Sequence, residues 1–186
     1  AFAGTNITSV GEVGSGSSIE IPKGVTTLES SWFANCKQLK TVTYPKHLTT
    51  IATSMFNGCT LLESINGSSN NNVLLHDNVI SIGNSAFANI TNLTYINIPS
   101  SVSTIGTNAF LNCTNLKEVI LPDTITSIGD YTFRNCTSLE KITMPVSLTT
   151  GMYVFDGISN IKEINLTKGT GIMPNLSPND ANFGHS

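Results

Sequence analysis

The stretch INIPSSVSTIGTNAFLNCTNLKEVILPDTITSIGDYTFRNCTSLEKITMP, Ile96 to Pro145, contains one pattern written twice. Within it, NAFLNCTNL begins at Asn108 and YTFRNCTSL begins at Tyr131, which is 23 residues later. A fixed period of roughly 20 to 50 residues is typical of proteins in which one structural unit stacks on the next. The stretch therefore predicts a stack of similar units rather than a domain built around one central core.

The same pattern occurs six times along the chain. Its third place holds a phenylalanine, and aliphatic residues recur six and nine places later. The phenylalanines are Phe33, Phe56, Phe87, Phe110, Phe133 and Phe155, at intervals of 23, 31, 23, 23 and 22 residues. The first aliphatic column is Leu39, Leu62, Leu93, Leu116, Leu139 and Ile161. The second aliphatic column is Val42, Ile65, Ile96, Val119, Ile142 and Ile164.

The consensus of one unit is L-x-x-V-x-L-P-x-x-V-T-S-I-G-x-x-A-F-x-N-C-T-x. Its V-x-L segment has apolar residues at every second position and is rich in β-branched residues. This predicts a short strand that ends at the proline. The V-T-S-I-G-x-x-A-F segment is too short and too rich in β-branched residues for a long helix. We therefore expect an extended piece, followed by a single helical or 3₁₀ turn around A-F. One unit cannot bury its apolar side chains alone, so neighbouring units must cover one another.

From about Ile19 to Leu166 this consensus resembles the BspA-like, or Treponema pallidum-type, leucine-rich repeats, and the opening stretch carries the resemblance most clearly. The resemblance implies an α/β repeat solenoid, with short parallel strands on a concave face and extended, 3₁₀ or short helical turns on the convex side. Such repeats occur in secreted and surface proteins of host-associated bacteria and of protists such as Trichomonas. The resemblance therefore implies an extracellular or cell-surface protein.

The pattern divides the chain into three parts. We expect a lead-in or cap at residues 1–18, a solenoid of about six 23-residue units at 19–166, and a cap or linker at 167–186. The 31-residue interval contains an insertion at 66–73, predicted to be a loop or hairpin on one rim. This insertion is either a tolerated surface extension or a recognition loop beside the binding face. Because the ends lack a strongly polar cap and the chain starts without methionine, we expect a longer parent protein.

Composition argues against several function classes. Charged residues make up 11% and the net charge is −3 without a basic cluster, which disfavours a nucleic-acid partner. No run of eighteen apolar residues occurs, so no segment is predicted to insert into a membrane. The histidines are His47, His76 and His185, and neither of the first two aligns with a cysteine or carboxylate cluster. We therefore predict no catalytic residue, no cofactor and no metal, and do not expect an enzyme.

The four cysteines share one column of the repeat with two isoleucines. Because the column accepts isoleucine equally well, we interpret it as a buried apolar position and predict four unreactive thiols. A disulfide between adjacent units, Cys36–Cys59 or Cys113–Cys136, is the alternative in an exported protein. The full column is Cys36, Cys59, Ile90, Cys113, Cys136 and Ile158.

The column before the cysteines alternates between asparagine and glycine. These two residue types tolerate positive φ, which predicts a left-handed turn residue at this place. Three of these asparagines, Asn89, Asn112 and Asn135, create N-x-[ST] sequons, which either follow from the repeat or accept sugar in a protist. The column is Asn35, Gly58, Asn89, Asn112, Asn135 and Gly157.

Strand residues that alternate with the buried column should face outward on the concave sheet. We predict that they form a wide polar binding face, with its most distinctive patch at Tyr95, Glu118, Ile120 and Lys141. The complete predicted face is Thr41, Thr43, Ser64, Asn66, Tyr95, Asn97, Glu118, Ile120, Lys141, Thr143, Glu163 and Asn165.

Two functions are compatible with this pattern. The leading hypothesis is a non-enzymatic binding or adhesion domain, which recognises a protein or glycan of a host or microbial surface on the concave sheet. Adhesion and location come from the family resemblance. The alternative is a structural spacer, a repeat module that presents another domain of a larger surface protein.

Overall fold

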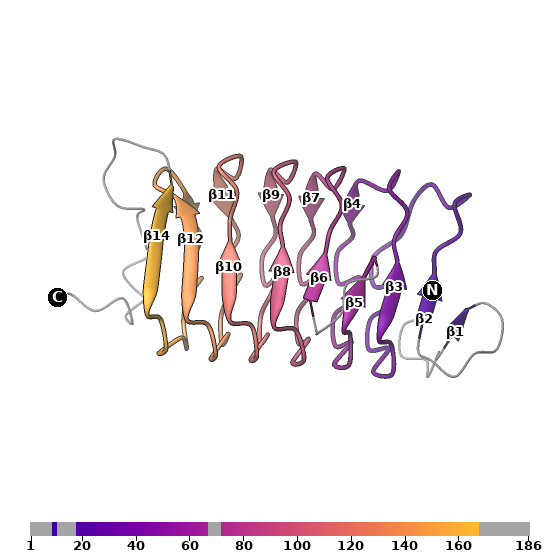
Figure 1. The fold of residues 1–186 in the computed structure, drawn as a ribbon, viewed down its shortest axis with the longest axis horizontal. Coiled ribbons are helices and arrows are strands. Elements are labelled where there is room, and N and C mark those ends of the chain that lie inside the picture. Colours follow the sequence, from indigo (N-terminus) through magenta and orange to yellow (C-terminus); the bar gives the residue numbers. More distant parts are fainter. Residues whose placement is uncertain (1–8, 11–17, 67–71, 168–186) are drawn as a thin grey trace.

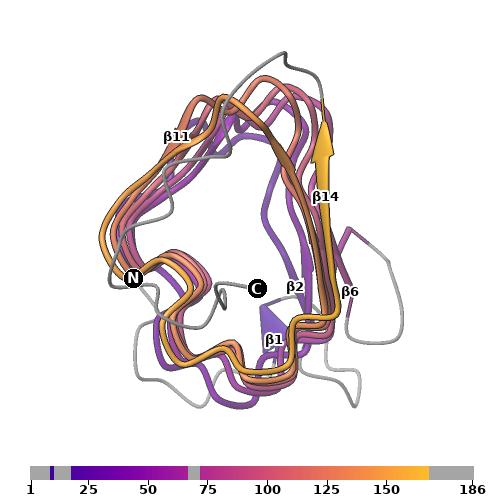
Figure 2. The ribbon, with the colours of Figure 1, turned by 90° about the vertical axis from the view of Figure 1, so that its left-hand side faces the viewer.

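The computed structural model describes residues 9–10, 18–66 and 72–167. These residues form a parallel β-solenoid of about six turns, seen from the side in Figure 1 and along its axis in Figure 2. The predicted repeat solenoid is therefore confirmed. The predicted lead-in, the predicted C-terminal cap and the centre of the insertion lie almost entirely outside the described residues.

The V-x-L segments form one long sheet. Within the described residues, nine strands lie in the order β1-β2-β3-β5-β6-β8-β10-β12-β14, and every neighbouring pair is parallel. Val119 pairs with Ile96 on one side and Ile142 on the other, so the predicted columns are also the register. The strands are β1 (Ser9–Val10), β2 (Ser18–Glu20), β3 (Thr41–Thr43), β5 (Ser64–Ile65), β6 (Asn72–Leu74), β8 (Tyr95–Asn97), β10 (Glu118–Ile120), β12 (Lys141–Pro145) and β14 (Glu163–Thr167).

The V-T-S-I segments form a second sheet on another side of the solenoid. It has five parallel strands in the order β13-β11-β9-β7-β4, which confirms that these segments are extended. Its strands are β4 (Thr50–Ile51), β7 (Ser81–Ile82), β9 (Thr104–Ile105), β11 (Ser127–Ile128) and β13 (Thr149–Thr150). Each complete turn passes from the long sheet to this one, and then through the A-F turn back to the long sheet.

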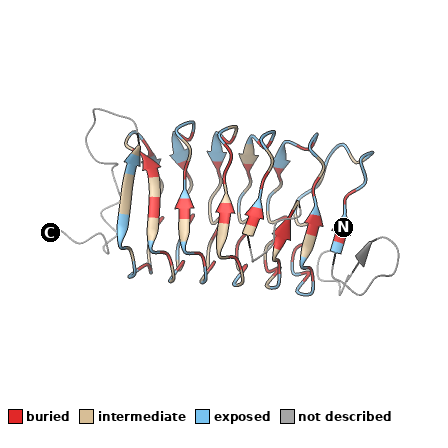
Figure 3. Ribbon diagram, in the orientation of Figure 1, coloured by how far each residue is buried: buried red, intermediate tan, exposed pale blue. Residues whose placement is uncertain are grey.

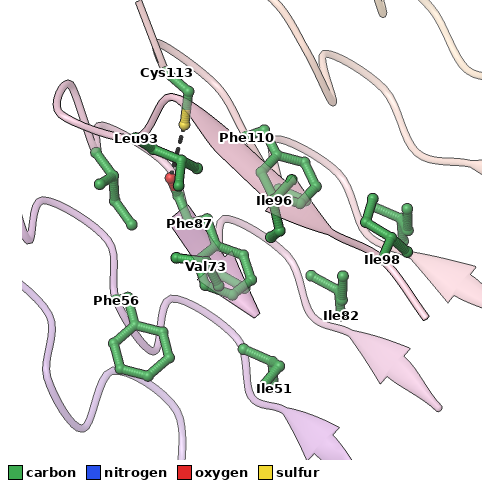
Figure 4. Close-up of a cluster of buried hydrophobic side chains, with 14 of the residues drawn as sticks. Ile51, Phe56, Val73, Ile82, Phe87, Leu93, Ile96, Ile98, Phe110 and Cys113 are labelled. Carbon is green, nitrogen blue, oxygen red and sulfur yellow. Dashed lines mark hydrogen bonds between the residues drawn. The ribbon is translucent and has the colours of Figure 1, made fainter. Parts of the chain in front are cut away.

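Side chains of neighbouring turns stack in columns inside the solenoid. Figure 3 shows that buried residues follow the strands through every turn, and along β8 and β10 the middle residue is buried between more accessible ones. The six repeat phenylalanines are at most 1% exposed, and successive rings stack with centroids 5.2–5.8 Å apart. Three of them, Phe56, Phe87 and Phe110, are drawn in Figure 4. Offset stacking at this separation adds to the stabilisation from area burial.

The described residues contain no helix, so the expected helical or 3₁₀ turn around A-F is wrong, and so is the α/β description. The N–H groups of Asn108 and Phe110 donate to carbonyls of the next turn, at 2.8 and 2.9 Å. Those of Ala109 and Leu111 instead donate to carbonyls three residues back, at 3.3 and 3.1 Å. Because every second donor is used between turns, no continuous helical ladder can form.

Two places in every A-F turn adopt the left-handed backbone region. The predicted asparagine and glycine column is confirmed, since all six members have φ between 59° and 76°. A second column four residues earlier has φ between 54° and 63° and contains no glycine. That second column is Ser31, Ser54, Ser85, Asn108, Tyr131 and Tyr153.

The asparagine column also forms a side-chain ladder between turns. The Nδ2 groups of Asn89, Asn112 and Asn135 each donate to the Oδ1 atom one turn earlier, at 2.8–2.9 Å, starting from Asn57. An added Cβ at Gly157 would lie 2.3 Å from Oδ1 of Asn135, so glycine leaves room for that amide. In three of the predicted sequons, the nitrogen to which a sugar would attach is therefore a ladder donor.

Replacement of Asn112 separates the two roles of this column. Asn112→Gly keeps the favoured backbone but loses the ladder, whereas Asn112→Ala also places a Cβ in the left-handed region. We expect the alanine variant to be less stable than the glycine variant by about 1 kcal/mol, measured by urea denaturation. Asn115→Ala, an exposed position in the same unit, serves as the control. Equal stability of the alanine and glycine variants would contradict the role assigned to positive φ.

The insertion adds one strand to the long sheet and none to the short one. β5 and β6 lie side by side between β3 and β8, whereas β4 pairs directly with β7. β5 and β6 pair in parallel, so the hairpin interpretation is wrong, and residues 67–71 between them lie outside the described part of the chain. The rings of Phe56 and Phe87 are tilted by 20°, against at most 8° elsewhere in the stack. The extra strand lengthens one side of the stack, and this tilt accommodates it.

Candidate functional site

The long sheet turns one side away from the core along the whole stack, and we call this side the sheet face. It consists of the residues on either side of the buried central residue of each strand, because successive side chains of a strand point to opposite sides. The parallel register aligns these residues in two rows. The first row is Ser18, Thr41, Ser64, Asn72, Tyr95, Glu118, Lys141 and Glu163. The second row is Glu20, Thr43, Leu74, Asn97, Ile120, Thr143 and Asn165.

Ten of the twelve predicted face residues lie in these rows and are at least partly exposed; they are Thr41, Thr43, Tyr95, Asn97, Glu118, Ile120, Lys141, Thr143, Glu163 and Asn165. Ser64 is a correction, because it is only 2% exposed between Thr41 and Asn72. Asn66 is partly exposed but is not part of the two rows. Its Oδ1 accepts the N–H of Tyr44 at 2.8 Å and its Nδ2 donates to the carbonyl of Leu74 at 3.3 Å. Asn66 therefore connects the ends of neighbouring strands.

Four face residues were missed in the sequence. Ser18 and Glu20 lie on β2, and Asn72 and Leu74 lie on β6, which the insertion adds. The signal for the second pair was present, because Val73 aligns with Ile96 in the repeat. Residues on either side of Val73 therefore occupy the same places as those on either side of Ile96.

Three charged side chains lie together across neighbouring strands. Nζ of Lys141 lies 3.6 Å from Oε1 of Glu118 and 3.5 Å from Oε1 of Glu163. A hydrogen bond from Nδ2 of Asn165 (2.7 Å), and secondarily the Lys141 charge, holds the pKa of the Glu163 carboxyl below its ordinary value. Exposed ion pairs contribute little to stability, about 0–1 kcal/mol. The triplet therefore shapes the charge of the face more than it stabilises the fold.

Apolar side chains interrupt the polar face on both sides of β8. Leu74 on β6 and Ile120 on β10 are each 41% exposed. Asn97 lies between them in the second row, and the half-buried Tyr95 occupies β8 in the first row. These four residues form what we call the β8 patch.

The outer side of the short sheet differs from the sheet face. Its strands present small hydroxyl residues, and Oγ of Ser81 donates to Oγ1 of Thr50 at 3.2 Å. None of the register partners in this column is charged or aromatic. The column is Thr50, Ser81, Thr104, Ser127 and Thr149.

The cysteine column lies in the core, as predicted. All four cysteines are buried and none of them forms a disulfide, so the disulfide alternative is wrong. The Cys113 thiol donates to the carbonyl of Phe87 at 3.1 Å, as Figure 4 shows, and Cys59 and Cys136 bond to phenylalanine carbonyls in the same way. Burial raises the pKa of Cys59 and of Cys113 to about 12, and raises that of Cys136 well above its ordinary value. The thiolate that nucleophilic chemistry requires is therefore disfavoured at these three positions.

The native protein should not react with a thiol reagent at pH 8, whereas the protein in concentrated guanidinium should show four reactive thiols. The rate at which an aromatic disulfide reagent releases its coloured thiolate separates the two states. Rapid labelling of any thiol before denaturation would contradict the buried, protonated column.

The same pKa shift predicts a loss of stability in alkali. The pKa of a thiol in the unfolded protein lies near its ordinary value of 9.0, whereas the pKa of Cys113 in the folded protein is about 12. The unfolded state therefore loses protons first, and stability falls as pH rises from about 9 toward about 12, by about 1.4 kcal/mol per pH unit for each such thiol. Urea denaturation at pH 8 and pH 10 measures the slope, which should be smaller in Cys113→Val.

The described histidines bond to the backbone. Nε2 of His47 lies 2.6 Å from the carbonyl of Val25, and Nε2 of His76 lies 3.1 Å from that of Pro45. His185 lies outside the described residues. In the part of the chain that the structure covers, no three His, Cys, Asp or Glu side chains gather where they could hold a metal ion. The same part contains no helix with the length and apolarity to cross a bilayer.

Solved structures of bacterial repeat proteins resemble this solenoid. The leucine-rich repeat protein of T. pallidum has a TM-score of 0.68 and 26% identity, over 80% of this chain and 68% of that one. A leucine-rich cell surface protein of Faecalibacterium prausnitzii has a TM-score of 0.66 and 23% identity, over 91% of this chain and 50% of that one. A leucine-rich repeat protein of Eubacterium ventriosum has a TM-score of 0.58 and 25% identity, over 83% and 38%. This chain thus spans about half the length of the F. prausnitzii protein.

No curated protein matches the sequence. The model of the BspA-type leucine-rich repeat region matches it in six copies, over residues 1–75 and 66–177. This match covers most of the chain, and its repeats are those that build the two sheets and the phenylalanine stack. The chain therefore belongs to the BspA-type leucine-rich repeat family.

Proposed function

We propose that this solenoid is a non-enzymatic binding module of an exported protein, and that it recognises a protein or glycan through the sheet face. The observation that carries the proposal is the contrast between the two sheets. The sheet face presents Tyr95, Glu118 and Lys141 in register, whereas the short sheet presents only small hydroxyl residues. Curved or extended sheets of repeat proteins commonly serve as binding surfaces. A location outside the cell is supported by the family.

The chemistry of the described residues supports binding rather than catalysis. Three of the four thiols are held protonated by burial, and the two described histidines are engaged with backbone carbonyls. The charged groups of the sheet face are surface ion pairs rather than a general acid and base set apart by their surroundings. These features favour a surface that binds without transforming its partner.

A spacer function is the second candidate. It is favoured by the uniform contacts between turns, since each new turn can be added on the same phenylalanine and strand ladders. It is also favoured by the length of the F. prausnitzii protein, of which this chain covers half. As a spacer, the solenoid would set the distance of another domain from its anchor.

The triple variant Tyr95→Ala, Glu118→Ala, Lys141→Ala tests the proposal. We expect it to lose at least about 10-fold in affinity for whichever probe the native protein binds on an array of matrix proteins, mucins and glycans. The melting temperature should stay close to native, because these side chains lie outside the core. Binding is measured by surface plasmon resonance.

The matched control replaces Thr104 and Ser127 of the short sheet by alanine, and it should keep native affinity. Full affinity of the triple variant, or no binding to any probe on the array, would reject the binding face and favour the spacer.

A further inference from the structure

We infer that the partner of the sheet face is a protein, which inserts an apolar side chain into the β8 patch and places a basic group against the Glu118–Lys141–Glu163 triplet. This inference rests on the proposed function and goes on to name the chemistry of the partner. Three properties of the face carry it: aliphatic exposure on both sides of β8, the polar group between the aliphatic side chains, and the sign of the charge beside them.

Exposed aliphatic side chains distinguish the β8 patch from the rest of the face. Leu74 and Ile120 are each 41% exposed, on strands two places apart in the sheet. Neighbouring strands lie about 4.8 Å apart, so the two side chains are separated by roughly 9.6 Å along the stack. Such a pair can contact both flanks of one inserted side chain. Apolar area removed from water drives this kind of contact.

The centre of the patch can fix the orientation of the inserted group. Asn97 lies between Leu74 and Ile120, and Tyr95 lies on the same strand. An amide offers both a donor and an acceptor to a partner backbone, and a tyrosine offers a rigid ring with a polar end. Interfaces between proteins commonly combine an aromatic anchor, aliphatic contacts and a few polar groups. A glycan, whose surface is mostly hydroxyl, would leave the two aliphatic side chains with little to bury.

The charged residues next to the β8 patch determine which sign of charge the surface of the partner should carry. Lys141 lies between two carboxylates, at 3.6 Å from Glu118 and 3.5 Å from Glu163, and can neutralise only one of them. Because the pKa of Glu163 is lowered, its carboxylate stays ionised at pH values at which an ordinary glutamate begins to take up a proton. The triplet therefore carries two carboxylates and one ammonium, which favours a basic group of the partner over an acidic one.

The experiment uses the full chain, a parallel set of glycans, and arrays of short immobilised peptides in three classes: leucine with arginine, leucine with glutamate, and serine with arginine. We expect retention by the leucine–arginine class, with affinity that falls as salt rises. Leu74→Ser with Ile120→Ser should lower that affinity by about 10-fold. Glu163→Lys should lower it by a similar factor and flatten the salt dependence.

Two matched controls lie outside the rows. Ile80→Ser removes an aliphatic side chain that is 50% exposed beside the short sheet. Glu29→Lys reverses an exposed carboxylate before the first phenylalanine turn. Both variants should bind as the native protein does.

The outcomes separate the two proposals. Binding of glycans alone, equal binding of acidic and basic peptides, or an equal loss in Ile80→Ser would overturn the inference while a binding function remained. No binding to any peptide or glycan would count against both.

Discussion

Every turn of this solenoid depends on apolar contact with the turn next to it. The phenylalanine rings stack at 5.2–5.8 Å, and each strand pairs with the equivalent strand one unit away. A single unit of about 23 residues has no second layer of its own on which to bury these side chains. Ordering a residue costs roughly 1–2 kcal/mol, and burial offsets this cost only when a neighbour is present. The fold is therefore a chain of pairwise contacts, with stability distributed along it.

Most of the architecture could be predicted from the residues found at equivalent positions of the repeat. Each position occurs six times, and the residue types that replace one another there show what the position requires. Exchange between Cys113 and Ile90 identifies a core position, and exchange between Asn112 and Gly58 identifies positive φ. The outward side of each strand then follows from alternation. Ten of the twelve predicted face residues lie in the two exposed rows for this reason. Comparison of the six repeats shows which property each position requires, and a single repeat does not show this.

Contacts between turns, rather than within them, explain what was missed. The A-F turn resembles a helical turn in sequence, but every second N–H donates to the next turn. The second left-handed column contains Tyr131 and no glycine, so composition gives no sign of it. The glycine of V-T-S-I-G has an ordinary φ. An added Cβ at Gly129 would lie 2.4 Å from the N of Thr107, one turn away. The strand added by the insertion brought Leu74 onto the face.

The interior of the solenoid repeats from turn to turn, whereas its exterior varies, and the proposed function lies on the sheet face. The central claim, that each turn is stabilised by its neighbours, is tested most directly by native-state hydrogen exchange. Amides of β8, in the middle of the described stack, should be the most protected, and protection should decrease stepwise toward β2 and β14. Equal protection in β2, β8 and β14 would contradict it, because one indivisible core would then hold all the turns together.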